Sequence, residues 1–228
     1  MSQHVIAILI YVLAGSLAAV SFLIRRKCQF KTPGGPAWPF AKNQGLALEF
    51  ADSPGFVDRL LGKAGTEVGD HNRKAAKLFQ KLDFVFIPLY ALFFIFSAIY
   101  KSGWSKALPV IGFALMTAIL DVSEDIQILR MICGKSTASA KRFGQAKWLF
   151  YFATIGLAGY LYFLVIFDSA MTKGAFLGTL LIVVAVIGIC SILRGGFTGI
   201  SIAAILSVIG LTGLAFAPLL GSSIFNNR

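Results

Sequence analysis

The chain has 228 residues, of which 57% are hydrophobic and only 14% are charged, and its formal net charge at pH 7 is +11. Because a soluble domain usually carries about 25% charged residues, this chain has too few to cover a water-soluble globule of its size. Aromatic residues make up 13% of the chain, which excludes disorder, because disordered chains are poor in aromatic and branched apolar residues. The composition therefore predicts an integral membrane protein.

Six apolar stretches are long enough to cross a bilayer core, which needs about 20 residues of helix; they are 5–24, 83–100, 108–132, 148–167, 174–193 and 198–218. The runs are continuous and do not alternate, which favours helices over transmembrane strands. We therefore expect an all-α, polytopic membrane protein with about six transmembrane helices. Residues 1–24 form the first helix, 25–82 a cytoplasmic loop, 83–218 a five-helix region and 219–228 a short C-terminal tail.

The Lys and Arg residues predict the orientation. If the N-terminus is outside, 17 of the 21 basic residues fall in cytoplasmic segments, namely 25–82, 130–147 and the turn near Arg194. The positive-inside rule favours this arrangement, so we expect both termini outside a cell (inner) membrane. No basic residue precedes the first stretch and three follow it, which indicates a retained anchor instead of a cleaved signal peptide. The net charge is then a topology signal, and no nucleic-acid partner is expected.

The cytoplasmic loop contains a short alternating segment, 46–50, and then a predicted amphipathic helix over 54–62. Ser53 is suited to the N-cap, Pro54 to the first helical position and Gly62 to the end. The helix has an apolar face, so it either lies on the cytoplasmic membrane surface or caps the helical bundle.

A basic helix is predicted before the second span, with Asp70 as its cap. Its basic residues recur at helical spacing; they are Arg73, Lys74, Lys77 and Lys81. Such a face suits anionic lipid headgroups, and it is also compatible with an ordinary solvated face.

Four carboxylates fall inside or at the edge of the second and third spans; they are Asp83, Asp121, Glu124 and Asp125. The last three are three or four residues apart and share a helix face. If the two spans run antiparallel through a short turn, Asp83 lies level with Asp125, and Asp121 lies about one turn deeper. Charges inside a membrane helix are costly and usually have a partner or a function.

Four neighbouring carboxylates cannot all stay ionised without compensation. One solution is a bound divalent cation, since oxygen ligands suit Mg²⁺, Ca²⁺ and Mn²⁺. A second is shared protons, and a third is pairing with Arg130, Lys147 or Arg194 on the same side of the membrane. No nucleophile–base pair is evident, so we assign no catalytic residue.

The sixth span carries a ridge of small residues, Gly195, Gly199, Ala203 and Ser207, at intervals of four. Helices in lipid associate through close backbone approach at such residues. We therefore expect this ridge to face a protein neighbour, either another helix of this chain or a membrane-protein partner.

The run 82–90, LDFVFIPLY, followed by 120–125, LDVSED, resembles a pattern in uncharacterised bacterial multi-pass membrane proteins. In those proteins, an LDF-F-x-x-x-Y span precedes a span ending D-x-x-E-N, and the segment 48–53 is similar to their cytoplasmic segment. Asp125 replaces the Asn here. The resemblance implies no activity.

Three functions remain compatible with the sequence. The first is a small membrane protein that binds a cation or protons at the four acids, as a transporter would. The second is a non-catalytic subunit or assembly factor of a larger membrane complex. The third is a metal-dependent lipid-modifying enzyme.

Overall fold

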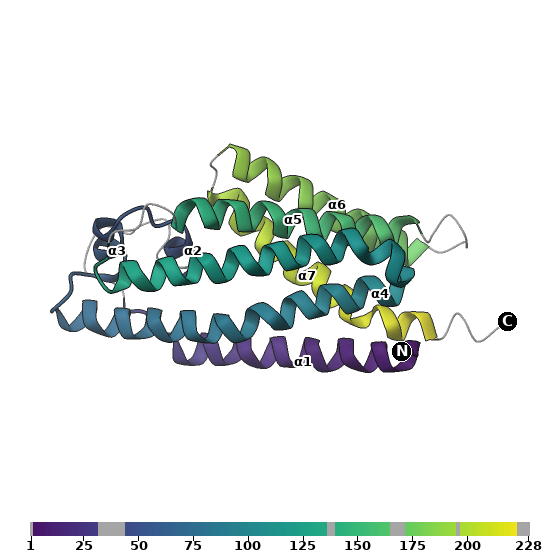
Figure 1. The fold of residues 1–228 in the computed structure, drawn as a ribbon, viewed down its shortest axis with the longest axis horizontal. Helices are drawn as coiled ribbons and strands as arrows, with labels where there is room; N and C mark the ends of the chain where they lie inside the picture. The colour runs from purple at the N-terminus through teal and green to yellow at the C-terminus, as the bar shows by residue number, and fades with distance from the viewer. Residues whose placement is uncertain (1, 32–43, 136–139, 165–171, 195–196, 223–228) are drawn as a thin grey trace. The chain divides into compact units, whose positions relative to one another are not determined.

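The computed structural model describes residues 2–31, 44–135, 140–164, 172–194 and 197–222, and every regular element in these residues is a helix (Figure 1). The helices are α1 (Gln3–Lys27), α2 (Gln44–Glu49), α3 (Pro54–Leu61), α4 (Glu67–Ile132), α5 (Ala140–Leu164), α6 (Thr172–Leu193) and α7 (Phe197–Ser222). The predicted all-α class is therefore confirmed for the described residues. Two of the helices, α1 and α4, are long and apolar enough to cross a membrane.

The chain divides into two compact units. Unit 1 comprises Met1–Ser16, Tyr90–Thr117 and Trp148–Arg228, and unit 2 comprises Leu17–Leu89 and Ala118–Lys147. The helix α4 contributes its middle to unit 1 and both of its ends to unit 2, so each unit is described below by itself.

The long helix α4 is broken at Gly103, whose backbone has φ 74° and ψ 172°. Only glycine adopts such a conformation without steric cost. Figure 1 shows that α4 turns back on itself. The predicted second and third spans correspond to the two arms on either side of the break. The first arm begins earlier than predicted: Thr66 caps it by accepting from the Gly69 N–H, and Asp70 lies in its first turn, where it accepts from the Gly65 N–H.

In unit 2, α2 and α3 pack on the ends of α4 and α5. The predicted helix α3 is confirmed, with Ser53 accepting from the Phe56 N–H at 3.2 Å and Gly62 after its last residue. The segment before it is a helix, α2, and not the extended piece that its alternation suggested. Apolar side chains of both helices are buried with residues of α4 and α5 in one cluster: Ala47, Leu48, Ala51, Val57, Leu60, Leu61, Ala76, Ile128, Met131, Ile132 and Ala140. Of the two predicted placements, the structure shows the capping one.

The basic face at the start of α4 divides into two parts. The Arg73 guanidinium donates to the carbonyl oxygen of Gly62 and pairs with Asp58 of α3. Arg73 therefore joins α4 to α3, whereas Lys74, Lys77 and Lys81 are exposed.

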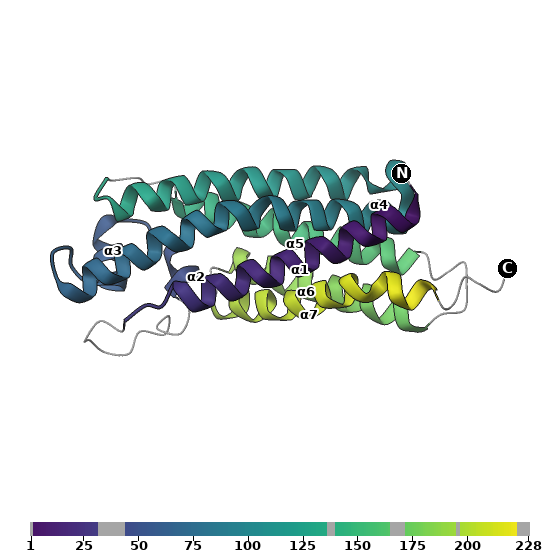
Figure 2. The same cartoon turned by 90° about the horizontal axis from the view of Figure 1, so that it is seen from below.

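In unit 1, α6 and α7 lie side by side in both views (Figure 1 and Figure 2). A Cβ atom added to Gly210 of α7 would lie 2.4 Å from Leu181 of α6, and one added to Gly159 of α5 would lie 2.8 Å from the same side chain. At Gly159 the contact involves the Leu181 Cβ and the Gly178 carbonyl oxygen, so glycine is required there, as expected for helices that associate by backbone contact.

Two members of the predicted ridge on α7 are buried within the chain. Ala203 is fully buried, and the Ser207 hydroxyl lies 3.0 Å from the Tyr151 hydroxyl of α5. This part of the ridge therefore packs against another helix of the chain. The structure does not describe Gly195 or the surroundings of Gly199. The helix α7 continues to Ser222, beyond the predicted boundary at residue 218.

Large apolar side chains are exposed on most of the long helices. On α1, Ile8, Val12 and Phe22 are about 60% exposed, while Ile6, Ile10 and Leu13 are the buried residues of that helix. Similar exposed residues occur on α4, α6 and α7, among them Leu108, Ile119, Val186, Val208 and Ile209. An apolar surface of this extent is typical of a protein whose surroundings are apolar too.

Candidate functional site

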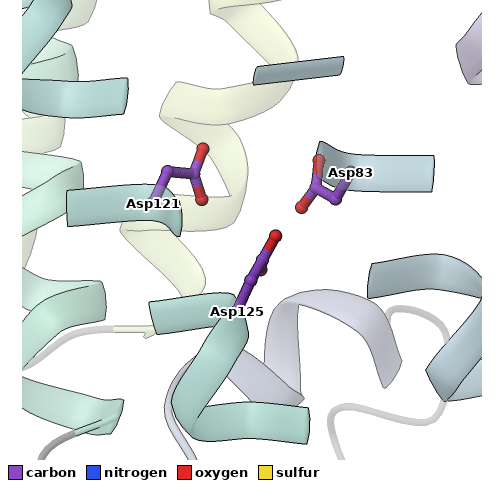
Figure 3. A group of neighbouring side chains, drawn as sticks. All are labelled: Asp83, Asp121 and Asp125. Carbon is purple, nitrogen blue, oxygen red and sulfur yellow. The ribbon is translucent and has the colours of Figure 1, made fainter. Parts of the chain in front are cut away.

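The strongest candidate site lies in unit 2, where three aspartates from the two arms of α4 meet. One carboxylate oxygen each of Asp83, Asp121 and Asp125 lies within 4.8 Å of the others. Asp83 comes from the first arm, and the other two come from the second, one helical turn apart. We call these residues the aspartate trio; their carboxylates point toward one another (Figure 3).

The trio is shielded from water on the side of the second arm. Asp125 is 1% exposed and Asp121 6%, whereas Asp83 is half-buried. The Oδ2 atom of Asp125 is buried and has no hydrogen-bond partner among the described residues. A buried carboxylate oxygen without a partner is unusual, and it leaves a position at which a proton or a metal ion could bind.

A buried lysine occupies the other side of Asp121. The Lys147 ammonium of α5 lies 3.0 Å from Asp121 Oδ1, 2.9 Å from Glu49 Oε2 and 2.5 Å from Glu124 Oε2. Of the three basic residues predicted as partners, Lys147 is the one in contact with the acids, while Arg130 and Arg194 are exposed. Asp121 therefore belongs both to the aspartate trio and to the carboxylates that form ion pairs with Lys147.

Glu124, the fourth predicted acid, belongs to the lysine side of the site. Its side chain is fully buried, Oε2 faces Lys147, and Oε1 has no hydrogen-bond partner among the described residues. A Cβ atom added to Gly144 of α5 would lie 2.5 Å from Glu124 Oε1. The backbone of α5 thus lies directly against this carboxylate.

The charges of the site do not balance within the described contacts. The Lys147 ammonium contacts the carboxylates of Glu49, Asp121 and Glu124. Asp121 in turn lies beside two further carboxylates, those of Asp83 and Asp125. Burial makes uncompensated charge expensive, and like charges at this spacing repel one another. The geometry therefore calls for additional positive charge, which protons or a bound cation can provide.

The sequence missed Glu49 as a member of the site, and it did not single out the buried Gln80. Glu49 lies in a six-residue helix, where no periodicity indicates its direction, although it belongs to the segment that carried the resemblance. Gln80 lies three residues before Asp83, hence on a neighbouring position of the same helix face. It is fully buried, and neither amide atom has a hydrogen-bond partner among the described residues.

Comparisons with known proteins add no assignment: no protein-family model, no curated protein and no solved structure matches the chain.

Proposed function

We propose that the chain is an integral membrane protein that binds protons or a cation at Asp83, Asp121 and Asp125. The single observation that carries the proposal is the convergence of three carboxylates within 4.8 Å in a largely buried position. Carboxylate oxygens are the preferred ligands of Mg²⁺, Ca²⁺ and Mn²⁺, and closely spaced carboxylates also share protons. Either ligand would supply the positive charge that Lys147 alone does not.

The membrane placement is supported by the surface of the protein. Large apolar side chains are exposed along α1, α4, α6 and α7, while all the charged groups of the site except the half-buried Asp83 are buried. This distribution is the reverse of that in a soluble bundle. In the proposed arrangement, the chain crosses the cell membrane six times, and both termini are outside.

Transport is the finer form of the proposal. A site of carboxylates beside a fixed ammonium can exchange its ligand, because Lys147 stabilises the emptied carboxylates until the next ligand arrives. Polar groups inside membrane helices are typical of ion pathways and proton relays. The exposed residues Lys74, Lys77 and Lys81 would meet anionic lipid headgroups at the cytoplasmic surface, whereas Arg73 already pairs with Asp58.

A second function, that of a non-catalytic subunit or assembly factor, is favoured by the three ion pairs of Lys147. In that case, the acids serve to hold helices together and exchange no ligand. A metal-dependent lipid-modifying enzyme would use the same aspartate trio as metal ligands, so the experiment below tests its metal site as well.

The proposal is tested by binding measurements on the purified protein in lipid nanodiscs. Calorimetric titrations with Mg²⁺, Ca²⁺ and Mn²⁺ test the cation. A potentiometric titration above about pH 6 tests the protons, because ordinary carboxyl groups are already ionised there. Asp125→Asn removes one member of the trio with little change of shape, and Asp52→Asn changes an exposed acid as the matched control.

Binding by the trio requires that Asp125→Asn lose the cation heat or the proton uptake while Asp52→Asn keeps both. If the two variants and the unmodified protein are alike in all the titrations, the trio binds neither ligand. The acids then have the structural role that a subunit would give them.

A further inference from the structure

The segment α2–α3, residues 44–61, brings one negative charge into the acid site. We call this segment the cap. Glu49 is the last residue of α2, is 9% exposed, and places Oε2 at 2.9 Å from the Lys147 ammonium. The cap therefore contributes a carboxylate to a site that already contains more negative than positive charge.

The cap is seated closely against the helices that carry the other acids. Leu48 and Leu61 are fully buried in the apolar cluster with Ile128 and Met131 of α4. A Cβ atom added to Gly144 of α5 would lie 2.6 Å from the carbonyl oxygen of Glu49. This contact fixes the end of α2 at the backbone of α5, three residues before Lys147.

Two opposing electrostatic effects act on Glu49 in this position. The ammonium of Lys147 attracts it, but the same ammonium also contacts Asp121 and Glu124. The carboxylates of the aspartate trio and Glu124 repel Glu49, and this repulsion is strong because little water screens it. Apolar packing holds the cap in place. The negative charge of the aspartate trio weakens the docking of the cap, and neutralising this charge strengthens it.

We propose that the cap senses the charge of the aspartate trio through Glu49 and docks more firmly when a bound cation neutralises the trio. This regulatory role rests on the proposed function. By linkage, a firmly docked cap raises the affinity of the trio for its ligand by the same factor. The order of a cytoplasmic segment thereby depends on whether the membrane site is occupied.

Neutralising substitutions test the coupling without knowledge of the ligand. Asp125→Asn mimics an occupied trio, and Glu49→Gln removes the charge through which the cap responds. Hydrogen exchange of the protein in nanodiscs, followed by mass spectrometry of peptides covering 47–61, reports how often the cap opens. Peptides from 177–193 in α6 serve as the internal reference.

The coupling predicts that Asp125→Asn slows exchange in 47–61 about threefold or more, the size expected for residues in one charge network. In the Glu49→Gln background, the same substitution should have no effect on these peptides. Exchange in 177–193 should be unchanged throughout. If Asp125→Asn does not fold, Asp83→Asn tests the same coupling at the half-buried member of the trio.

Two results would overturn the inference. Exchange in 47–61 that is insensitive to both Asp125→Asn and Asp83→Asn shows that packing alone holds the cap. Slowing that persists in the Glu49→Gln background shows that the cap responds by another route. The proposed function fails separately, when the titrations show no ligand at the trio, so the two failures are distinguishable.

Discussion

The two units of the molecule differ in what they bury. In the described part of unit 1, the buried polar residues are all hydroxyl-bearing: Ser97, Thr117, Thr154 and Ser207. In unit 2, the buried polar residues include five charged ones, namely Glu49, Asp121, Glu124, Asp125 and Lys147. The described part of unit 1 thus buries only neutral polar residues, whereas unit 2 buries a cluster of charged residues.

This difference shows which buried polar groups helix packing can accommodate without partners on other helices and which require such partners. Thr117 and Thr154 of unit 1 each donate at 2.8 Å to the carbonyl oxygen four residues earlier in their own helix, so they require no partner on another helix. The acids of unit 2 require Lys147 and one another. Because the described part of unit 1 packs its helices without buried charge, helix packing alone does not explain the acids of unit 2. Buried ion pairs are also a weak source of stability, which favours a function for them.

The largest effect is expected from Lys147→Met, which keeps the length of the side chain and removes its charge. Three carboxylates lose their shared ammonium, and breaking a buried pair from one side costs about 3–5 kcal/mol. The free energy of unfolding in detergent should fall by that amount. Lys141→Met, at an exposed position of the same helix, should leave it nearly unchanged.

A second substitution shows whether charge is the cause. In the Lys147→Met background, Glu124→Gln removes one of the carboxylates left without compensation, so it should restore part of the lost stability. If the double variant is no more stable than Lys147→Met alone, the lost stability came from packing and not from uncompensated charge. The difference between the two units would then not be electrostatic.

The sequence predicted the long helices and α3, but it missed the helix α2, and only part of the site in unit 2 could be predicted. The four acids lie on helices, where a spacing of three or four residues defines a shared face, and the antiparallel arrangement of the two arms placed Asp83 near Asp125. Glu49 could not be placed, because its direction depends on how the cap packs on α4 and α5. The sequence also left three basic partners open, and only the tertiary structure distinguishes buried Lys147 from exposed Arg130 and Arg194.

A smaller effect is expected in unit 1 from Gly159→Ala. The added Cβ would lie 2.8 Å from the Leu181 Cβ and 2.9 Å from the carbonyl oxygen of Gly178, neither of which can move without its backbone. Overpacking of this kind costs about 1–3 kcal/mol, again measurable as the free energy of unfolding in detergent.

The matched control substitution should change the free energy of unfolding in the opposite direction. A Cβ added to Gly112, also in unit 1, meets no atom within 4 Å. Gly112→Ala should therefore stabilise its helix by about 0.5–1 kcal/mol. If both substitutions shift stability in the same direction, close backbone approach is not what holds unit 1 together.

The smallest perturbation uses the cysteines, which can show on which side of the membrane unit 2 lies. Cys28 is a poor reporter, since burial raises the pKa of its thiol and so lowers the reactive thiolate fraction at neutral pH. Cys133 is exposed in the turn after α4. A variant that keeps Cys133 and carries Cys28→Ala and Cys190→Ala therefore isolates one accessible thiol.

With the cytoplasmic placement, a membrane-impermeant maleimide added to intact cells should leave Cys133 unlabelled, and permeabilised cells should label it fully. In a background without cysteine, Lys106→Cys places a thiol at an exposed position near the Gly103 turn of unit 1. That thiol should react in intact cells, because 17 of the 21 basic residues put this turn on the opposite side from Cys133. Labelling of Cys133 but not of Lys106→Cys in intact cells would invert the orientation and place the acid site on the outer side. Labelling of both thiols would exclude an arrangement in which α4 crosses the membrane twice.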